Sequence, residues 1–183
     1  MDETEVRNID YVEYLFWIER VYGSNYDNGS YPEVYWKALP DTNVWRDKLS
    51  YNEPYVESYL RHPAFNEYPV VGVNWEQARA FCNWRTDYRY SLLTPYERKY
   101  ETEYRLPTEI EWEYAARGNK DNSIYPWGGP YSRNSKGCFL ANFKPVRGNY
   151  IADGYAFTAP AVSYWMNDFG LYNLSGNVSE WTS

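Results

Sequence analysis

Apolar side chains recur at helical spacing near the start of the chain and predict a helix from Asn8 to Gly23. Asn8 is a residue type that caps helix N-termini, and Gly23 can end a helix in the left-handed conformation. The opposite face of this segment is polar, so we expect the helix to pack on a core. The expected core face carries Tyr11, Leu15, Ile18 and Tyr22, with Val12 and Phe16 beside them.

A second patterned segment predicts a strand that leads directly into a helix. Residues 68–74 form a short apolar run, and the helix is expected from Trp75 to about Arg85. Asn74 and Gln77 have the spacing of a capping box, in which each side chain accepts a hydrogen bond from the other residue's backbone N–H. We therefore expect this helix to begin sharply at Trp75.

A third helix is predicted over Glu109–Arg117. Thr108 and Glu111 form a second capping box, and Gly118 is placed to end the helix. Between the second and third helices, residues 88–103 are polar and rich in tyrosine and predict no defined element.

The remaining segments predict loops. Residues 24–68 are interrupted by Asn, Asp, Gly and Pro, so we expect them to be mostly irregular. After Gly118, turn-forming residues separate short aromatic pieces, which predicts short strands and long ordered loops. Aromatic residues make up 21% of the sequence and are expected to form the core. An aromatic core whose residues are separated by turns favours a loop-rich α+β domain over a helix bundle. An aromatic carbohydrate-binding surface is the alternative interpretation.

Length and charge narrow the classes of function. The 183 residues suffice for a single domain with a core, and no internal repeat divides them. The net charge of -7, with basic residues scattered among acids, argues against nucleic-acid binding. No apolar run reaches the ~18 residues that a membrane span requires. The N-terminal residues lack the features of an export signal, as those of a mature exported protein also do.

Few residues suggest catalysis. Cys82 and Cys138 are too few for a disulfide framework, and both are expected to be buried thiols. His62 is the single histidine, and no cysteine lies near it in the sequence, so neither a zinc site nor a Cys-His nucleophile pair is predicted. We therefore predict no catalytic residue and no site for an organic cofactor.

Two groups of hard oxygen ligands stand out instead. Asn142 and Asp153 bracket one loop, and Asn173 and Glu180 lie on either side of Gly176. Calcium takes carboxylate, amide and backbone carbonyl oxygens in irregular geometry, so each group is a candidate calcium site. The alternative is a pair of Asx-type turns whose side chains hydrogen-bond to nearby backbone groups.

Five motifs are spread along the chain, at residues 68–84, 104–118, 125–129, 141–142 and 167–181. The last of them reads Asn-Asp-Phe-Gly-Leu-Tyr-Asn-Leu-Ser-Gly-Asn-Val-Ser-Glu-Trp. In order and spacing these motifs resemble the formylglycine-generating enzyme (sulfatase-modifying factor) family. The resemblance covers nearly all of the chain and implies an irregular α+β variant of the C-type lectin fold, low in regular secondary structure.

Further segments resemble one branch of that family more closely. They lie at residues 1–6, 38–45, 59–64, 83–87 and 136–142. They are similar to the gliding-motility lipoproteins J and K of Bacteroidetes, with the J type matching better in the N-terminal half. This resemblance implies a non-catalytic scaffold in the gliding-motility and type IX secretion apparatus, bound to other proteins of that assembly. It also implies the periplasmic face of the outer membrane, with a lipid anchor outside this chain.

The resemblance also implies which residues hold structural calcium. The first site would use Asn142, the Phe143 carbonyl, Asp153 and the Tyr155 carbonyl. The second would use Asn173, the Leu174 carbonyl, Gly176, Val178 and Glu180.

The family's oxidase activity does not carry over to these residues. Its paired catalytic cysteines lie beyond the Glu-Trp motif that ends at residue 181, and Cys82 and Cys138 are not equivalent to them, so no copper is expected. We expect a single domain over residues 1–183 that is incomplete at both ends. After Asp87 the sequence departs from the pattern of the branch, which leaves open whether residues are missing near 87–103. Two alternatives stay open: a fragment of an oxidase whose cysteines follow residue 183, and a lectin-like glycan-binding module.

Overall fold

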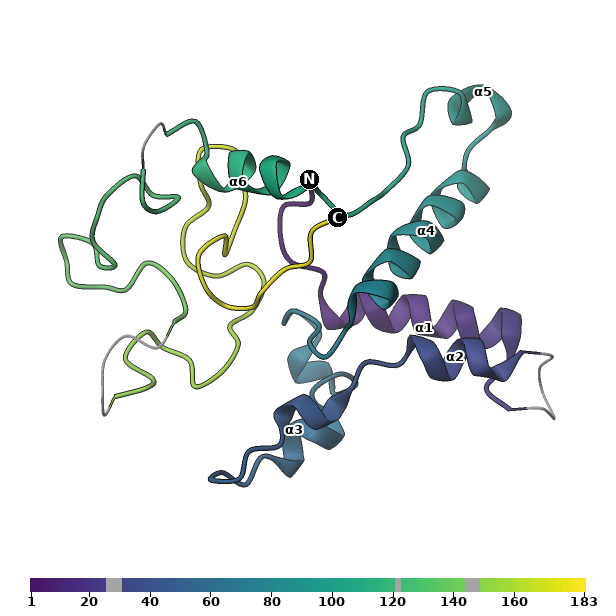
Figure 1. The fold of residues 1–183 in the computed structure, drawn as a ribbon, viewed down its shortest axis with the longest axis horizontal. Helices are drawn as coiled ribbons and strands as arrows, with labels where there is room; N and C mark the ends of the chain where they lie inside the picture. Colours follow the sequence, from purple (N-terminus) through teal and green to yellow (C-terminus); the bar gives the residue numbers. More distant parts are fainter. Residues whose placement is uncertain (26–30, 121–122, 144–148) are drawn as a thin grey trace. The chain divides into compact units, whose positions relative to one another are not determined.

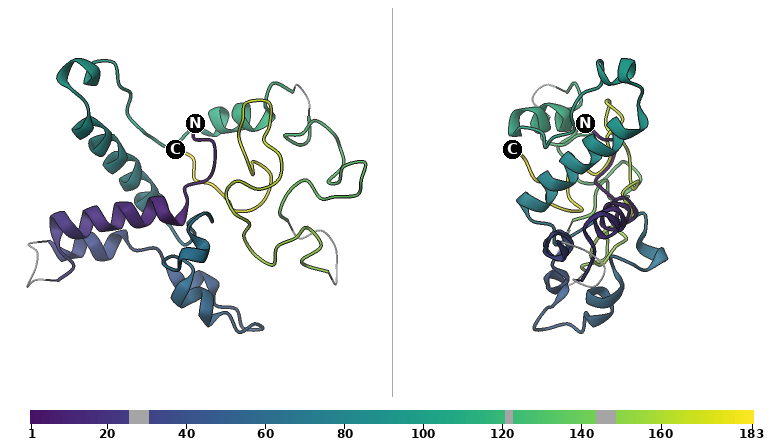
Figure 2. Two further views of the ribbon diagram at one scale, coloured as in Figure 1. Left: turned by 180° about the vertical axis from the view of Figure 1, so that it is seen from behind. Right: turned by 90° about the vertical axis from the view of Figure 1, so that its right-hand side faces the viewer.

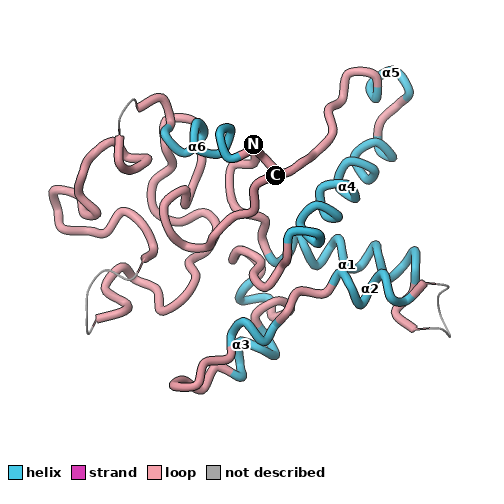
Figure 3. Tube along the Cα trace, in the orientation of Figure 1, coloured by secondary structure: helices cyan, strands magenta, loops and turns pink. Residues whose placement is uncertain are grey.

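The computed structural model describes residues 1–25, 31–120, 123–143 and 149–183, and in them the chain is helical and irregular (Figure 1). No strand occurs among these described residues, which carry only isolated β-bridges (Figure 3). None of their helices has the length and apolar character needed to cross a membrane. The elements, in order, are α1 (Asn8–Tyr22), α2 (Pro32–Ala38), η1 (Thr42–Trp45), α3 (Glu53–Ser58), η2 (Pro63–Phe65), α4 (Trp75–Leu92), α5 (Pro95–Arg98) and α6 (Glu109–Arg117).

The chain divides into two compact units, each built from separate stretches of sequence. The helical unit comprises Ile9–His62 and Val71–Leu106. The loop unit comprises Met1–Asn8, Pro63–Val70 and Pro107–Ser183. The prediction of one family domain stays a prediction, and the two units are described separately below.

In the helical unit, α1 confirms the predicted first helix, and aromatic rings join it to α4. Tyr11 is 1% exposed and stacks on Phe81 of α4, with ring centroids 5.6 Å apart. Tyr14, also buried, contacts both rings edge-on. α2 lies alongside α1 in every view of Figures 1 and 2. The unit is therefore held chiefly by apolar and aromatic packing.

The ends and flanks of α1 differ in part from prediction. Gly23 adopts φ 80 and its N–H donates to the Glu19 carbonyl, so it ends the helix as expected. Asn8 is the first helical residue, and its side-chain amide donates to the Phe65 carbonyl. Val12 and Phe16, placed beside the core face by sequence, are exposed.

The second predicted helix is confirmed at its start and is longer than predicted. Asn74 and Gln77 form the complete capping box. α4 then continues to Leu92 because Tyr88, in the segment that predicted no element, stacks on Trp84 with ring centroids 5.3 Å apart. A further capping box, missed in the sequence, opens the short helix α5.

The prediction that residues 24–68 are mostly irregular is wrong in part, because α2, η1 and α3 lie there. Proline at the start of α2 and of α3 occupies the first helical turn, where its missing N–H costs nothing. Trp45 stacks on Tyr55 with ring centroids 5.2 Å apart and fixes η1 against α3. These prolines therefore begin helices, whereas the sequence pattern treated them as interruptions.

In the loop unit, α6 confirms the third predicted helix. Thr108 and Glu111 complete the capping box, and Gly118 ends the helix in the left-handed region at φ 57. α6 is the one helix among the described residues of 107–183 (Figure 3). Its apolar face packs on the last motif of the chain, in a cluster of Ala115, Ala116, Leu171 and Leu174 with Trp112 against it.

The predicted strands are wrong for the described residues, and with them the β part of the α+β prediction. The only described β-bridge of the apolar run at 68–74 is the one between Arg7 and Pro69. Beside it, the Asn8 N–H donates to the Tyr68 carbonyl and the Val70 N–H donates to the Val6 carbonyl. After Gly118 the described loops carry one further isolated bridge, between Arg133 and Phe139. Among the described residues these pairings do not continue into a ladder.

Candidate functional site

The predicted oxygen ligands all belong to the loop unit, where they form two neighbouring clusters. In the first cluster, the Phe143 N–H donates to Asp153 Oδ2 at 2.7 Å, which joins the two ends of the loop. Asp153 is 9% exposed, and its other carboxylate oxygen, Oδ1, is buried with no hydrogen-bond partner among the described residues. A buried carboxylate oxygen without a partner is costly unless a cation or donor satisfies it.

Two hydrogen-bond acceptors fix the orientation of the Asn142 side-chain amide. Its side-chain NH2 donates to the Phe157 carbonyl at 2.7 Å and to Asn177 Oδ1 at 3.0 Å. The Phe157 carbonyl cannot donate, so the amide nitrogen must face it. The remaining atom, Asn142 Oδ1, is therefore the oxygen that is left to meet a cation.

Tyr155 and Tyr164 complete the first cluster. The Tyr164 hydroxyl donates to the backbone carbonyl of Asp153 at 2.9 Å, and its ring meets that of Tyr155 edge-on. Burial, together with the negative charge of Asp153, raises the pKa of Tyr164 to about 12, so the phenol stays a neutral donor at neutral pH. Sequence analysis did not single out Tyr164.

In the second cluster, Asn173 and Glu180 have different partners. The Asn173 NH2 donates to Glu5 Oε2 at 3.0 Å and to the Ala161 carbonyl at 2.9 Å. Glu180 Oε2 accepts from the Trp112 indole N–H on α6 at 2.8 Å. The Leu174 side chain lies in the apolar cluster, and Val178 is half-buried.

Gly176 brings the two clusters together. It adopts φ 99, and a Cβ at this position would lie 2.2 Å from the Asn142 carbonyl oxygen, so no other residue fits. The next residue, Asn177, donates its backbone N–H to that same carbonyl at 2.8 Å. Asn177 Oδ1 also accepts from the Ala159 N–H, so this one side chain links three segments of the loop unit.

Glu5 is the main site residue that sequence analysis missed. It is 8% exposed, and its two oxygens accept from the side chains of Asn173 and Asn177 at 3.0 and 2.9 Å. Burial raises the pKa of Glu5 to about 7, and the nearby charge of Glu180 adds to this, against the opposing effect of the amide hydrogen bonds. Burial also raises the pKa of Glu180, partly opposed by its bond from Trp112. A single acidic residue near the N-terminus has no sequence pattern that would predict its binding to Asn173 and Asn177.

The residues of the first cluster fit a calcium ion. The unsatisfied Asp153 oxygen and the amide oxygen of Asn142 are hard ligands of the kind that calcium accepts. Across the described part of the chain no group of three or more His, Cys, Asp or Glu side chains gathers, so such a site would draw on amide and backbone oxygens. In the second cluster, the buried carboxylates Glu5 and Glu180 repel each other, and a cation would relieve this repulsion. The Asx-turn alternative shares the same hydrogen bonds, so calcium stays a prediction.

The cysteines differ from their prediction in part. Cys82 is half-buried on α4, but Cys138 is exposed, and neither forms a disulfide. Cys138 lies in a turn where its N–H and that of Lys136 both donate to Asn134 Oδ1, which turns the side chain outward. The expectation of two buried thiols is therefore wrong for Cys138.

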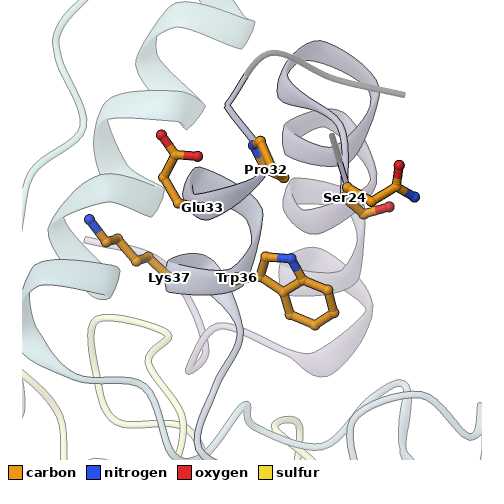
Figure 4. A pocket seen from close by; sticks show the side chains of 6 residues that line it. Ser24, Pro32, Glu33, Trp36 and Lys37 are labelled. Carbon is orange, nitrogen blue, oxygen red and sulfur yellow. The ribbon is translucent and has the colours of Figure 1, made fainter. Parts of the chain in front are cut away.

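An open pocket of about 530 Å³ lies in the helical unit, beside the C-terminal end of α1 (Figure 4). Trp36 is 60% exposed, and Figure 4 shows its ring on one side of α2 and the side chains of Glu33 and Lys37 extending to the other side. The pocket is lined by Ser24, Asn25, Pro32, Glu33, Trp36 and Lys37.

Comparisons with known proteins agree with the resemblance at the level of the family. The model of the "Sulfatase-modifying factor enzyme 1-like domain" matches residues 1–183. The "Inactive C-alpha-formylglycine-generating enzyme 2" of Bos taurus is 39% identical over 118 residues, which is 64% of this chain and 33% of that protein.

Two further relatives cover 83% and 64% of the chain. The mouse protein of the same name (Mus musculus) is 34% identical over 153 residues, 83% of this chain and 41% of its own length. The mouse "Formylglycine-generating enzyme" is 38% identical over 121 residues, 64% of this chain and 27% of that protein. The chain thus spans between 27% and 41% of the length of these relatives.

Proposed function

The chain belongs to the family of the sulfatase-modifying factor enzyme 1-like domain, and we propose that it serves there as a non-catalytic structural component. The observation that carries this proposal is the closed network around the half-buried Asn177, whose side chain binds the buried Asn142 amide, the buried Glu5 carboxylate and the backbone. Such a site stabilises a loop scaffold and leaves no side chain of the network exposed for chemistry. The inactive relatives from cattle and mouse are consistent with this role.

A peptide assay tests the non-catalytic proposal directly. The full-length protein, loaded with copper, is incubated with a sulfatase-type cysteine peptide and the product is followed by mass spectrometry. We expect no formylglycine, with an active family member as the positive control. Conversion of the cysteine would contradict the proposal and favour the alternative, an oxidase whose catalytic cysteines follow residue 183.

The finer proposal is a scaffold lipoprotein of the gliding-motility and type IX secretion apparatus. It is supported by the branch-specific segments at residues 1–6, 38–45, 59–64, 83–87 and 136–142. It places the protein at the periplasmic face of the outer membrane, held by a lipid anchor outside this chain. Affinity purification of the tagged full-length protein from its host is expected to recover other proteins of that apparatus. Recovery of the protein alone from intact outer membranes would contradict this role.

We also propose that calcium occupies the two oxygen clusters of the loop unit. A bound calcium ion supplies positive charge to buried oxygens and joins loops that are distant in sequence. The residues that would hold it are Asn142, Phe143, Asp153 and Tyr155 in the first cluster, and Asn173, Leu174, Gly176, Val178 and Glu180 in the second. Elemental analysis of protein purified without chelator is expected to find calcium, and protein free of metal after saturation with calcium would contradict the proposal.

The pocket at Trp36 gives a specific reason to keep glycan binding as the second candidate. An exposed indole presents a flat apolar face, which suits stacking against a sugar ring. Binding on a glycan array that Trp36→Ala abolishes would favour this candidate. Trp165, which is 58% exposed in the loop unit, offers a matched control through Trp165→Ala. A glycan array on which the wild-type protein gives no signal would contradict glycan binding.

A further inference from the structure

Tyr164 has an unusual backbone for a bulky residue. Its φ is 60, in the left-handed region, where a side chain with a Cβ costs about 1–2 kcal/mol. Among the other non-glycine residues described with positive φ, all are asparagines, which tolerate this region. Strain of this kind persists where the surrounding structure holds the residue in place, and it is concentrated at functional sites.

The side chain of Tyr164 contacts both sides of Gly154 in the first cluster. Its hydroxyl donates to the Asp153 carbonyl at 2.9 Å, and its ring meets the Tyr155 ring with centroids 6.3 Å apart. Gly154 itself adopts φ 114 and has no side chain to hold this part of the loop. Tyr164 therefore supplies a restraint that the segment around Gly154 lacks.

The same segment holds the unsatisfied oxygen. Asp153 Oδ2 accepts a hydrogen bond from the Phe143 N–H, which leaves the buried Oδ1 without a partner among the described residues. The Asp153 carbonyl and the Asp153 carboxylate belong to one residue, so a bond that fixes the first limits the movement of the second. Preorganised ligands lose less conformational freedom when a cation binds.

We infer that Tyr164 is a positioning residue of the first cluster, whose hydroxyl holds Asp153 in the orientation that binds calcium. This inference rests on the proposed presence of calcium at that cluster. Tyr164 itself does not ligate the ion. Without its hydroxyl the loop still closes through the Phe143–Asp153 bond, but with a wider range of Asp153 orientations.

Calorimetric titration of the full-length, metal-free protein with calcium tests the inference. Asp153→Asn, which keeps an acceptor for the Phe143 N–H, is expected to remove one binding transition and so identifies the first site. Tyr164→Phe keeps the ring contact and removes the hydroxyl, so the Kd of that same transition is expected to rise roughly fivefold, or about 1 kcal/mol. Tyr131→Phe, which removes the hydroxyl of an exposed tyrosine elsewhere in the loop unit, is the matched control and is expected to leave the Kd unchanged.

The possible outcomes separate the inference from the calcium proposal. A wild-type protein with no calcium transition overturns both. A wild-type transition that Tyr164→Phe leaves unchanged overturns the inference alone. If Tyr164→Phe lowers the melting temperature equally in calcium and in EDTA and leaves the Kd unchanged, Tyr164 has only a structural role. This result also overturns the inference. A weaker transition with an unchanged melting temperature in EDTA supports the positioning role.

Discussion

The two units of this chain have cores of different chemistry. The helical unit buries rings such as Tyr11 and Phe81, and among its described residues the buried polar ones are Asn52 and Thr86. The loop unit buries a larger polar set, consisting of Glu5, Asn8, Asn142, Asp153 and Asn167. Apolar packing responds little to pH or cations, whereas buried amides and carboxylates respond to both. We therefore expect the two units to behave differently when charge or metal is changed.

The largest expected effect is that of Asn177→Ala in the loop unit. The substitution removes the side-chain bonds to Asn142, Ala159 and Glu5, and leaves Glu5 with fewer donors in a buried position. We expect the free energy of unfolding to fall by about 4 kcal/mol, measured by urea denaturation.

The matched control lies in the helical unit. Asn52 is also buried, but its side chain makes a single described bond, to the Trp45 carbonyl at 3.0 Å. Asn52→Ala is expected to cost about 1 kcal/mol. Equal losses for the two asparagines would contradict the idea that the polar network of the loop unit acts cooperatively.

The second prediction concerns pH and Glu5 in the metal-free protein. The pKa of Glu5 is raised from 4.5 to about 7 on folding, so the folded state holds this proton more tightly. Stability therefore falls as pH rises from the unfolded to the folded pKa, by up to about 3 kcal/mol from this residue, and then levels off. Glu5→Gln is expected to flatten that slope, and calcium is expected to reduce it by favouring the ionised form. An unchanged slope in Glu5→Gln would show that other groups cause it.

The third prediction tests the helical unit. Phe81 packs against Tyr11, Tyr14 and Trp84, so Phe81→Leu is expected to lower stability by about 1.5 kcal/mol through lost packing. Because no buried carboxylate is involved, the loss is expected to be the same at pH 5 and pH 8 and with or without calcium. A loss that depended on calcium would break the distinction between the units.

The smallest expected effect is at the helix caps. Thr108→Ala removes the cap of α6, whose Ala115 and Ala116 pack on the last motif, and is expected to cost about 1 kcal/mol. Thr94→Ala removes the equivalent cap of α5, none of whose residues is buried, and is expected to cost less than about 0.5 kcal/mol. Thermal denaturation compares the two variants, and the reverse order would contradict this ranking.

Sequence analysis predicted the parts of the fold that local chemistry determines. Apolar periodicity identified α1, and the capping boxes identified the first residues of α4 and α6. It missed the continuation of α4 to Leu92, which depends on the ring of Trp84 meeting Tyr88. It also predicted strands that a single bridge at Pro69 does not sustain.

The candidate site could be predicted only in its local parts. Asn142 and Asp153 were found because amide and carboxylate oxygens flank one loop, and the Phe143–Asp153 bond joins the two ends of that loop. Glu5 was missed because its partners, Asn173 and Asn177, lie far away in the sequence. Tyr164 was missed for a related reason, since its backbone conformation has no signature in residue type.

Amide hydrogen exchange of the full-length protein, in calcium and in EDTA, tests the central claim most directly. The backbone N–H groups of Phe143, Ala159 and Asn177 report on the polar network, and those of α1 and α4 report on the helical unit. We predict that EDTA lowers protection at the three network amides and leaves the amides of α1 and α4 unchanged. Equal protection in calcium and EDTA at all of these amides would contradict the account, as would a uniform loss across both units.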